Sequence, residues 1–141
     1  MTEANLYVES SALLRIVFDQ LCGAEIAARL NRADRLLSSR LTRIECSRAV
    51  LRLATERPTA TAALARAERD IDLLFDRIEI VEISADVAEL ARRVAPGALL
   101  RSLDAIHLAT WQLARRIAPD LGLLTADRRL ATAAGVDPLA D

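Results

Sequence analysis

The chain has 141 residues, of which 52% are hydrophobic, and this apolar content is sufficient for one core and favours a single domain over residues 1–141. Its 19 arginines are balanced by 20 acidic residues to a net charge of −1, so a polyanion must be bound by a local cluster rather than by an overall basic field. The absence of lysine excludes a Walker A phosphate loop and Schiff-base chemistry.

The apolar stretches and the cysteines favour a cytoplasmic protein with no membrane association. The first apolar run, Leu6 to Val8, is too short for a signal sequence, and no run approaches the ~20 residues that cross a bilayer. Cys22 and Cys46 have no metal-binding spacing, and we interpret them as small buried hydrophobes rather than as a disulfide.

The first half of the chain is expected to alternate apolar strands with helices. Ser10 and Ser11 are suitable N-caps, Gly23 interrupts a helical pattern, and Pro58 ends a long helix. The predicted elements are a strand at 6–9, a helix from 10 to about 20, a helix at 24–32, a strand at 35–38, a helix at 42–57 and a helix at 61–75.

The second half continues this alternation. The predicted elements are a strand at 77–83, a helix capped by Ser84 that ends at Pro96-Gly97, a helix capped by Ser102 that ends before Pro119, a strand at 122–125 and a helix at 126–134 that ends at Gly135. Parallel strands need crossovers of a dozen or more residues, which these helices supply. The pattern therefore predicts an α/β fold with a mostly parallel sheet covered on both faces.

Four carboxylates lie where strands turn into helices. Glu9 and Asp127 fall at the carboxyl ends of predicted strands, and Glu45 and Asp104 lie at the starts of helices. Parallel sheets bind ligands at this edge. Oxygen ligands suit Mg²⁺ or Mn²⁺, whereas a chain with one histidine cannot build a histidine-rich zinc centre. The four acids together predict a site for a divalent cation.

Each acid except Glu9 also has a purely structural explanation. Thr42 and Glu45 have the spacing of a capping box, and Asp104 and Asp127 are placed to interact with helix dipoles. Glu9 has no such explanation as long as Ser10 and Ser11 cap the helix that follows it. His107, three residues after Asp104, is interpreted as a hydrogen-bonded packing residue rather than as a general base.

Four segments of the sequence resemble, in order and spacing, the motifs of PIN-domain ribonucleases, specifically the VapC toxins of bacterial toxin-antitoxin pairs. The segments are Tyr-Val-Glu-Ser-Ser-Ala-Leu, Leu-Thr-Arg-Ile-Glu, Leu-Arg-Ser-Leu-Asp-Ala-Ile-His-Leu-Ala and Leu-Leu-Thr-Ala-Asp-Arg-Arg-Leu. Together they span almost the whole chain. The absence of lysine and of an Asp-x-Asp pair at the first strand argues against a haloacid-dehalogenase-like phosphatase or a receiver domain.

The resemblance implies a three-layer α/β/α fold with four to five strands and a Mg²⁺- or Mn²⁺-dependent endoribonuclease that cleaves structured RNA such as tRNA or rRNA. It implies a homodimer that a cognate VapB-type antitoxin holds inactive. By position, Glu9, Glu45, Asp104 and Asp127 correspond to the acidic quartet of metal ligands, and Ser11 corresponds to a residue that assists the site.

The sequence departs from this family at Glu9, where similar proteins usually carry Asp. The alternative function is therefore a catalytically weakened PIN-like domain that binds an antitoxin or RNA. Arginines beside the acids are candidate phosphate contacts, namely Arg40, Arg43, Arg101, Arg128 and Arg129. An apolar stripe on the first two helices is expected to form part of a dimer or antitoxin interface, and it comprises Val17, Leu21, Ile26 and Leu30.

Overall fold

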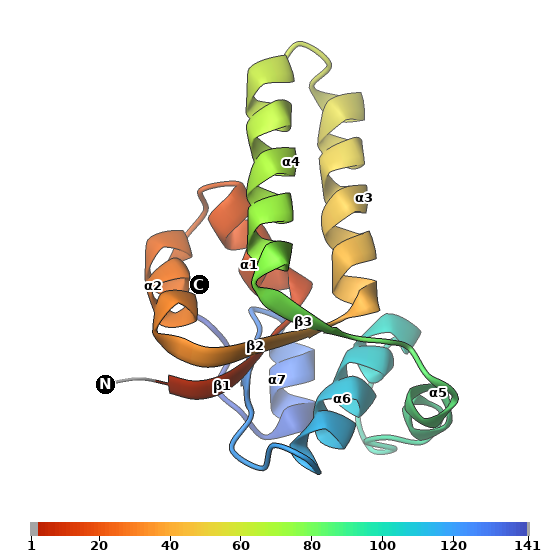
Figure 1. The fold of residues 1–141 in the computed structure, drawn as a ribbon. Helices are drawn as coiled ribbons and strands as arrows, with labels where there is room; N and C mark the ends of the chain where they lie inside the picture. Colours follow the sequence, from red (N-terminus) through yellow and green to blue (C-terminus); the bar gives the residue numbers. More distant parts are fainter. Residues whose placement is uncertain (1–2, 141) are drawn as a thin grey trace.

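Within residues 3–140, the part of the chain that this computed structural model describes, four parallel strands form a central sheet with helices on both faces (Figure 1). The strands are β1 (Glu3–Val8), β2 (Ala33–Ser39), β3 (Ile78–Val81) and β4 (Gly122–Leu124), in the spatial order β3-β2-β1-β4. The predicted three-layer α/β/α fold is confirmed, with four strands in the described range.

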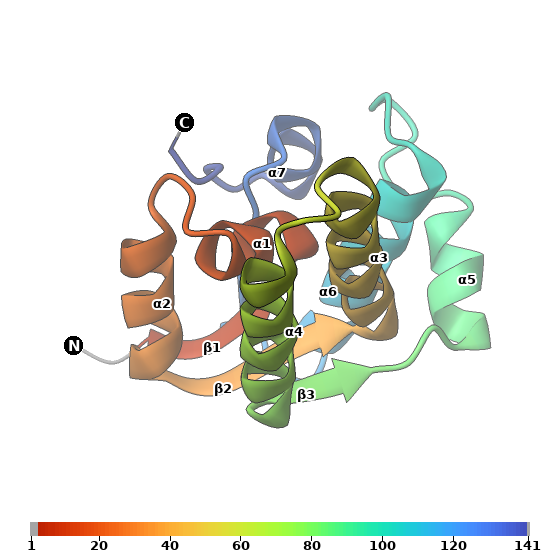
Figure 2. The same cartoon turned by 90° about the horizontal axis from the view of Figure 1, so that it is seen from above.

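The helices divide between the two faces of the sheet (Figures 1 and 2). One layer contains α1 (Ser10–Val17), α2 (Gly23–Arg32), α3 (Arg40–Glu56) and α4 (Thr61–Asp76). The other contains α5 (Ala85–Ala91), α6 (Ser102–Arg115) and α7 (Arg128–Ala134). Figure 1 shows α3 and α4 side by side as a long hairpin that rises away from the sheet.

The central strand β1 supplies both hydrophobic cores because successive side chains of a strand point to opposite faces. Leu6 and Val8 pack in the cluster that includes residues of α1, α2, α3 and α4. Tyr7, between them, packs in the second cluster with Leu108 and Trp111 of α6. This alternation places the Tyr7 ring beneath the sheet, on the side of α6.

Several helix starts differ from the sequence prediction because a different side chain reaches the free N–H groups. Glu9, not Ser10 or Ser11, is the N-cap of α1 and accepts a hydrogen bond from the backbone of Ser11. Ser39 caps α3 by accepting from the Leu41 N–H at 3.0 Å, so the predicted capping box of Thr42 and Glu45 is wrong.

The remaining boundaries follow from local backbone geometry. Ser84 caps α5 as predicted, but Ser102 is the first residue of α6 rather than its cap. The helix α5 ends at Ala91, before the predicted Pro96-Gly97, and Ala95 adopts a left-handed φ of 47°. A residue that precedes proline is disfavoured in the right-handed helical region, so the helix cannot continue to this point.

Gly23 explains the tight junction between α1 and α2. A Cβ atom at this position would lie 2.5 Å from the carbonyl oxygen of Arg15, so no larger residue fits without moving the backbone. Gly135, at the end of α7, has a φ of 73° and acts as the predicted left-handed C-cap.

Both cysteines are free thiols. Cys46 is buried, and burial raises the pKa of its thiol to about 12, so it stays protonated at neutral pH and behaves as a small apolar side chain. Cys22 is half-buried against the core. The helices of the described region include none that is both long and apolar enough to cross a bilayer.

Candidate active site

The carboxyl ends of β1 and β4 lie side by side, and the predicted site residues gather around them. Val8 pairs with Leu124 in parallel register, and the Glu9 N–H donates to the Leu124 carbonyl at 3.0 Å. Glu9 and Thr125 are the first residues after these two strands. On its other side β1 pairs with β2, from which α3 begins directly, so Glu45 is brought to the same edge.

The Glu9 carboxylate is buried, with 6% exposure of the residue, and donors of its own chain surround it. Its Oε1 accepts from the Ser10 hydroxyl at 2.8 Å, and its Oε2 accepts from the Thr125 hydroxyl at 2.9 Å. Ser11 donates to Oε2 through its backbone N–H at 3.1 Å and through its hydroxyl. These bonds compensate for the lost hydration of a buried carboxylate.

Ser11 also connects the first acid to the loop after β4. Its hydroxyl accepts from the Ala126 N–H at 2.8 Å and lies 3.3 Å from the Thr125 hydroxyl. Ser11, which the family resemblance implies to assist the site, therefore contacts Glu9 directly. It also connects Glu9 to the segment that leads to Asp127.

Glu45 extends from the second turn of α3 toward Glu9. Ser10 bridges the two acids, because its hydroxyl contacts Oε1 of Glu9 and lies 3.2 Å from Oε1 of Glu45. The same Glu45 oxygen lies 2.6 Å from Nε2 of His107 on α6. With 27% of its side chain exposed against 8% for Glu9, Glu45 is the more accessible of the pair.

His107 is buried, with 1% exposure, and is hydrogen-bonded at both ring nitrogens. Nδ1 lies 2.9 Å from the Tyr7 hydroxyl, and Nε2 also lies 4.0 Å from Oε1 of Glu9. The interpretation as a hydrogen-bonded packing residue is confirmed, but it missed that one partner is an acid of the site. The spacing of three residues from Asp104 was the only signal in the sequence, since the contact with Glu45 spans 62 positions.

Asp104 lies half-buried in the first turn of α6. The pKa of its carboxyl is raised, first by burial and then by the negative charges of Asp127 and Glu9, while Arg101 acts in the opposite direction. The carboxyl of Asp104 is therefore electrostatically coupled to those of Asp127 and Glu9.

Asp127 combines a structural contact with its place beside the other acids. Its Oδ1 accepts from the Leu130 N–H at 3.0 Å and caps α7, while its own N–H donates to the Thr125 hydroxyl at 3.0 Å. The predicted interaction with a helix N-terminus is therefore present.

The donor set fits a hard divalent cation. Glu9, Glu45 and His107 each offer a ligand atom, and these atoms lie within 4.8 Å of one another. Carboxylate oxygens suit Mg²⁺ and Mn²⁺, while Nε2 of His107 is already engaged by Oε1 of Glu45 at 2.6 Å. Asp104 and Asp127 are not among these ligand atoms, although burial and the charges of Asp127 and Glu9 raise the pKa of Asp104.

The candidate phosphate-binding arginines differ in their surroundings. Arg40 forms an ion pair with Glu82, and Arg43 forms one with Asp72 at 2.6 Å, so both have partners within the chain. Arg101 is exposed immediately before α6 and lies close enough to Asp104 to act on its pKa. The other two candidates are exposed in the first turn of α7, namely Arg128 and Arg129.

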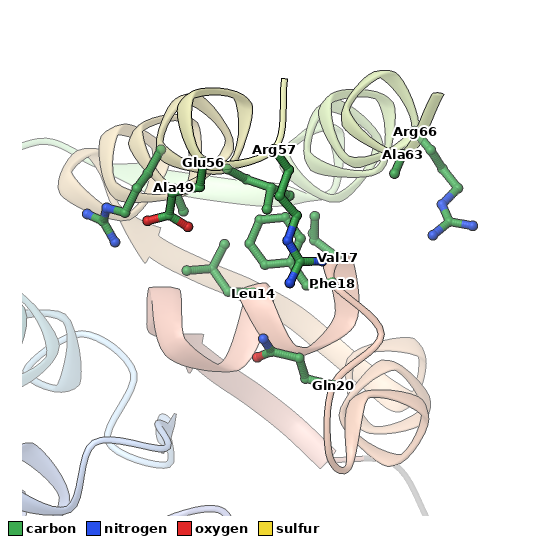
Figure 3. Close-up of a pocket in the computed structure, with 11 residues that line it drawn as sticks. Leu14, Val17, Phe18, Gln20, Ala49, Glu56, Arg57, Ala63 and Arg66 are labelled. Carbon is green, nitrogen blue, oxygen red and sulfur yellow. The ribbon is translucent and has the colours of Figure 1, made fainter. Parts of the chain in front are cut away.

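A groove of about 480 Å³ separates α1 from the α3–α4 hairpin (Figure 3). Its α1 side is apolar, and Figure 3 shows Leu14, Val17 and Phe18 directed toward it. The hairpin side carries charged residues, namely Arg52, Glu56, Arg57 and Arg66.

The predicted interface stripe is wrong for most of its members. Ile26 and Leu30 are each 1% exposed because α2 packs them into the core, and Val17 is 3% exposed. Only Leu21 is strongly exposed, at 56%. The available apolar surface of this region is instead the groove, where Leu14 and Phe18 are half-buried.

Comparison with known proteins identifies the family of this chain. A model of the PIN domain family matches residues 6–136. Ribonuclease VapC35 of Mycobacterium tuberculosis is 36% identical over 132 residues, which cover 92% of this chain and 89% of the relative.

Solved structures share the fold. The crystal structure of PAE2754 from Pyrobaculum aerophilum gives a TM-score of 0.69 at 21% identity, covering 97% of this chain and 85% of that chain. A toxin-antitoxin complex from Klebsiella pneumoniae gives a TM-score of 0.67 at 22% identity, covering 94% and 96%. By the match to the family model and by its identity to VapC35, the chain belongs to the PIN-domain family and, within it, to the VapC ribonucleases.

Proposed function

We propose that this protein is the toxin of a toxin-antitoxin pair and acts as a Mg²⁺- or Mn²⁺-dependent endoribonuclease on structured RNA such as tRNA or rRNA. The observation that carries the proposal is the convergence of carboxylates at one sheet edge, where Ser10 joins Glu9 to Glu45 and the charges of Glu9 and Asp127 raise the pKa of Asp104. The name of the relative VapC35 as a ribonuclease supports the reaction type.

In this proposal the four acids hold the cation, and the surrounding donors hold the acids. When bound, Mg²⁺ or Mn²⁺ supplies an activated water and stabilises the charge on the leaving oxygen of the phosphodiester. Ser11 and Thr125 keep the Glu9 carboxylate in one orientation through hydrogen bonds to Oε2. Arg101, exposed beside Asp104, is placed to contact an RNA phosphate.

The test is cleavage of purified total RNA with and without added metal. We expect fragments in the presence of Mg²⁺ or Mn²⁺, none after addition of EDTA, and recovery when excess metal is restored. Sequencing of the fragment ends would identify the RNA class. Intact RNA at every metal concentration would contradict the proposed activity.

The alternative is a catalytically weakened domain, and the hydrogen bonds around Glu9 support it. Both oxygens of Glu9 already accept hydrogen bonds from Ser10, Ser11 and Thr125, which is what a purely structural cap of α1 would need. The variant Glu9→Asp separates the two functions. An active wild-type protein with no gain in Glu9→Asp supports the nuclease, whereas activity that appears only in Glu9→Asp supports the weakened domain.

For the antitoxin we propose the groove between α1 and the α3–α4 hairpin as the binding surface (Figure 3). Its apolar side and its arginines suit a segment that carries both apolar and acidic side chains. The Klebsiella pneumoniae neighbour was solved as a toxin-antitoxin complex, which supports a partner of this kind. The expected homodimer stays a prediction, which light scattering of the purified protein checks.

The groove is tested by reversing one charge. Arg57→Glu should weaken binding of the antitoxin encoded beside this gene by ~10-fold or more, because it places a like charge against acidic side chains. Arg69→Glu, on an exposed position of the same hairpin outside the groove, is the matched control and should bind normally. Equal affinity of both variants, measured by titration calorimetry, would rule out the groove.

A further inference from the structure

Three elements of the fold meet in one buried chain of hydrogen bonds that ends at the candidate metal site. Tyr7 of β1, 0% exposed, places its hydroxyl 2.9 Å from Nδ1 of His107 on α6. The other ring nitrogen, Nε2, lies 2.6 Å from Oε1 of Glu45 on α3. The tyrosine and histidine rings meet edge to face, with centroids 6.2 Å apart and planes at 78°.

The Glu45 end fixes the direction of one of these hydrogen bonds, and in a neutral ring it thereby fixes the other as well. An ionised carboxylate only accepts, so Nε2 must carry a proton and donate to Glu45. In a neutral imidazole the other nitrogen is then an acceptor, so Nδ1 accepts from the Tyr7 hydroxyl. The tyrosine thereby selects the one neutral tautomer of His107 that presents an N–H to the site.

We propose that Tyr7 and His107 are positioning residues that hold the Glu45 carboxylate in the orientation needed to bind the divalent cation. This inference rests on the proposed metal-dependent function. His107 and Ser10 both reach Oε1 of Glu45, which leaves Oε2 to the cation. A glutamate side chain on a helix surface otherwise samples several rotamers, and ordering it in advance strengthens metal binding.

Space filling alone does not account for this arrangement. Phenylalanine would fill the site of Tyr7 without the hydroxyl, and leucine would be an apolar side chain for the buried site of His107. Tyr7 nevertheless carries its hydroxyl in an otherwise apolar cluster. Two buried polar side chains between β1 and α6 are costly unless satisfied, and the carboxylate that completes their satisfaction is one of the four acids. These hydrogen bonds therefore connect the packing between β1 and α6 to the orientation of the Glu45 side chain.

The first test needs no variant. His107 is the only histidine of the chain, so the ring nitrogens of a ¹⁵N-labelled sample give one unambiguous set of signals. For the neutral ring we expect the proton on Nε2 and none on Nδ1. A neutral ring with its proton on Nδ1 would overturn the proposal, whether or not the protein cleaves RNA.

The second test removes only the Tyr7 hydroxyl. In Tyr7→Phe the ring keeps its packing but Nδ1 loses its donor, so we expect the single tautomer to be lost from the ¹⁵N spectrum and the Mn²⁺ affinity to fall 10- to 100-fold. Titration calorimetry with Mn²⁺ alone measures the affinity. Thr110→Val is the matched control, since it removes a buried hydroxyl of α6 that bonds only to the Ile106 carbonyl, and it should leave the Mn²⁺ affinity unchanged.

The third test asks whether a replacement donor restores the site. His107→Gln offers an amide N–H to Glu45, whereas His107→Leu offers none, so Gln should recover at least ~10-fold of the Mn²⁺ affinity that Leu loses. Equal affinity of the two variants, or wild-type affinity in Tyr7→Phe, would overturn the positioning role. Failure of the wild-type protein to bind Mn²⁺ or cleave RNA would instead overturn the proposed function.

Discussion

The acids at the end of β1 and at the start of α6 carry the same charge but are stabilised in opposite ways. Glu9 is 6% exposed, yet Ser10, Ser11 and Thr125 donate to both of its oxygens. Asp104 is half-buried, and within residues 3–140 no hydrogen bond reaches its carboxylate, whose pKa is raised by burial and by Asp127 and Glu9. The more buried acid is thus the better satisfied one.

A metal site must hold its ligands in position and must also be stabilised when the cation binds. The two ends of the proposed site differ in these respects. The β1 end is ordered in advance, because its donors are present before any cation arrives. The α6 end retains repulsion, which a cation bound nearby would relieve. Substitutions at the two ends should therefore change stability in opposite directions, and the following predictions use that contrast.

The largest effect is expected for Asp104→Asn, which should lower cleavage by more than ~100-fold because it removes a ligand charge rather than a supporting contact. Asp86→Asn is the matched control, since Asp86 is an exposed acid in the first turn of α5. The rates of RNA cleavage at saturating Mg²⁺ measure the effect, and an active Asp104→Asn variant would remove this residue from the site.

The same variant should be at least as stable as the wild type without metal. Because the folded-state pKa of Asp104 is raised, ionisation of this carboxyl destabilises the fold once the pH exceeds the unfolded value of about 4. The stability difference between Asp104→Asn and wild type should be near zero below that pH and increase as the pH rises through the folded pKa. Thermal melts across this range in EDTA test the sign, and a less stable variant at pH 7 would reverse the comparison.

At the β1 end, Thr125→Val should destabilise the protein by about 1–3 kcal/mol. The Thr125 hydroxyl is fully buried, donates to Glu9 and accepts from the Asp127 N–H, so its removal takes one donor from the Glu9 carboxylate and leaves the Asp127 N–H without this acceptor. Urea denaturation in EDTA measures the free energy of unfolding. An unchanged value would show that the β1 end is not held by these donors.

A slightly smaller loss is expected for Glu9→Ala, at about 0.5–2 kcal/mol, because α1 loses its N-cap. The sign is opposite to that expected for Asp104→Asn, which makes the pair a direct test of the contrast. Glu25→Ala, in the exposed first turn of α2, serves as the control for loss of an acid near a helix N-terminus. If Glu9→Ala melts at a higher temperature than wild type, repulsion dominates at both ends.

The smallest effect should come from Thr42→Val, which is the counterpart of Thr125→Val. Thr42 is also fully buried, but its hydroxyl has no hydrogen-bond partner within the described residues. Replacing an unsatisfied hydroxyl by a methyl group of similar shape should be neutral or stabilise the fold by up to ~1 kcal/mol. The same urea titration applies, and a loss above ~1 kcal/mol would indicate that the hydroxyl has a partner in solution.

Local patterns predicted most of the element order. Apolar runs and breakers such as Gly23 and Pro58 located the strands and helices, because hydrophobic periodicity and backbone restriction act within a few residues. The helix starts were predicted less well. Ser10 and Ser102 are of a residue type that commonly caps helices. In the fold, however, Glu9 is the N-cap of α1, and the residue before Ser102 is the N-cap of α6.

By itself, the sequence determined the alternation of strands and helices and the position of four acids at their junctions, since both depend on neighbours along the chain. Only the tertiary structure decided which donors satisfy each acid. The contacts of Thr125 with Glu9 and of His107 with Glu45 span 116 and 62 positions, and the side chains meet because β4 pairs with β1 and α6 packs beneath the sheet. The spacing of residues along the sequence does not predict such pairs. The positions of the side chains in the site therefore follow from the parallel arrangement of the strands.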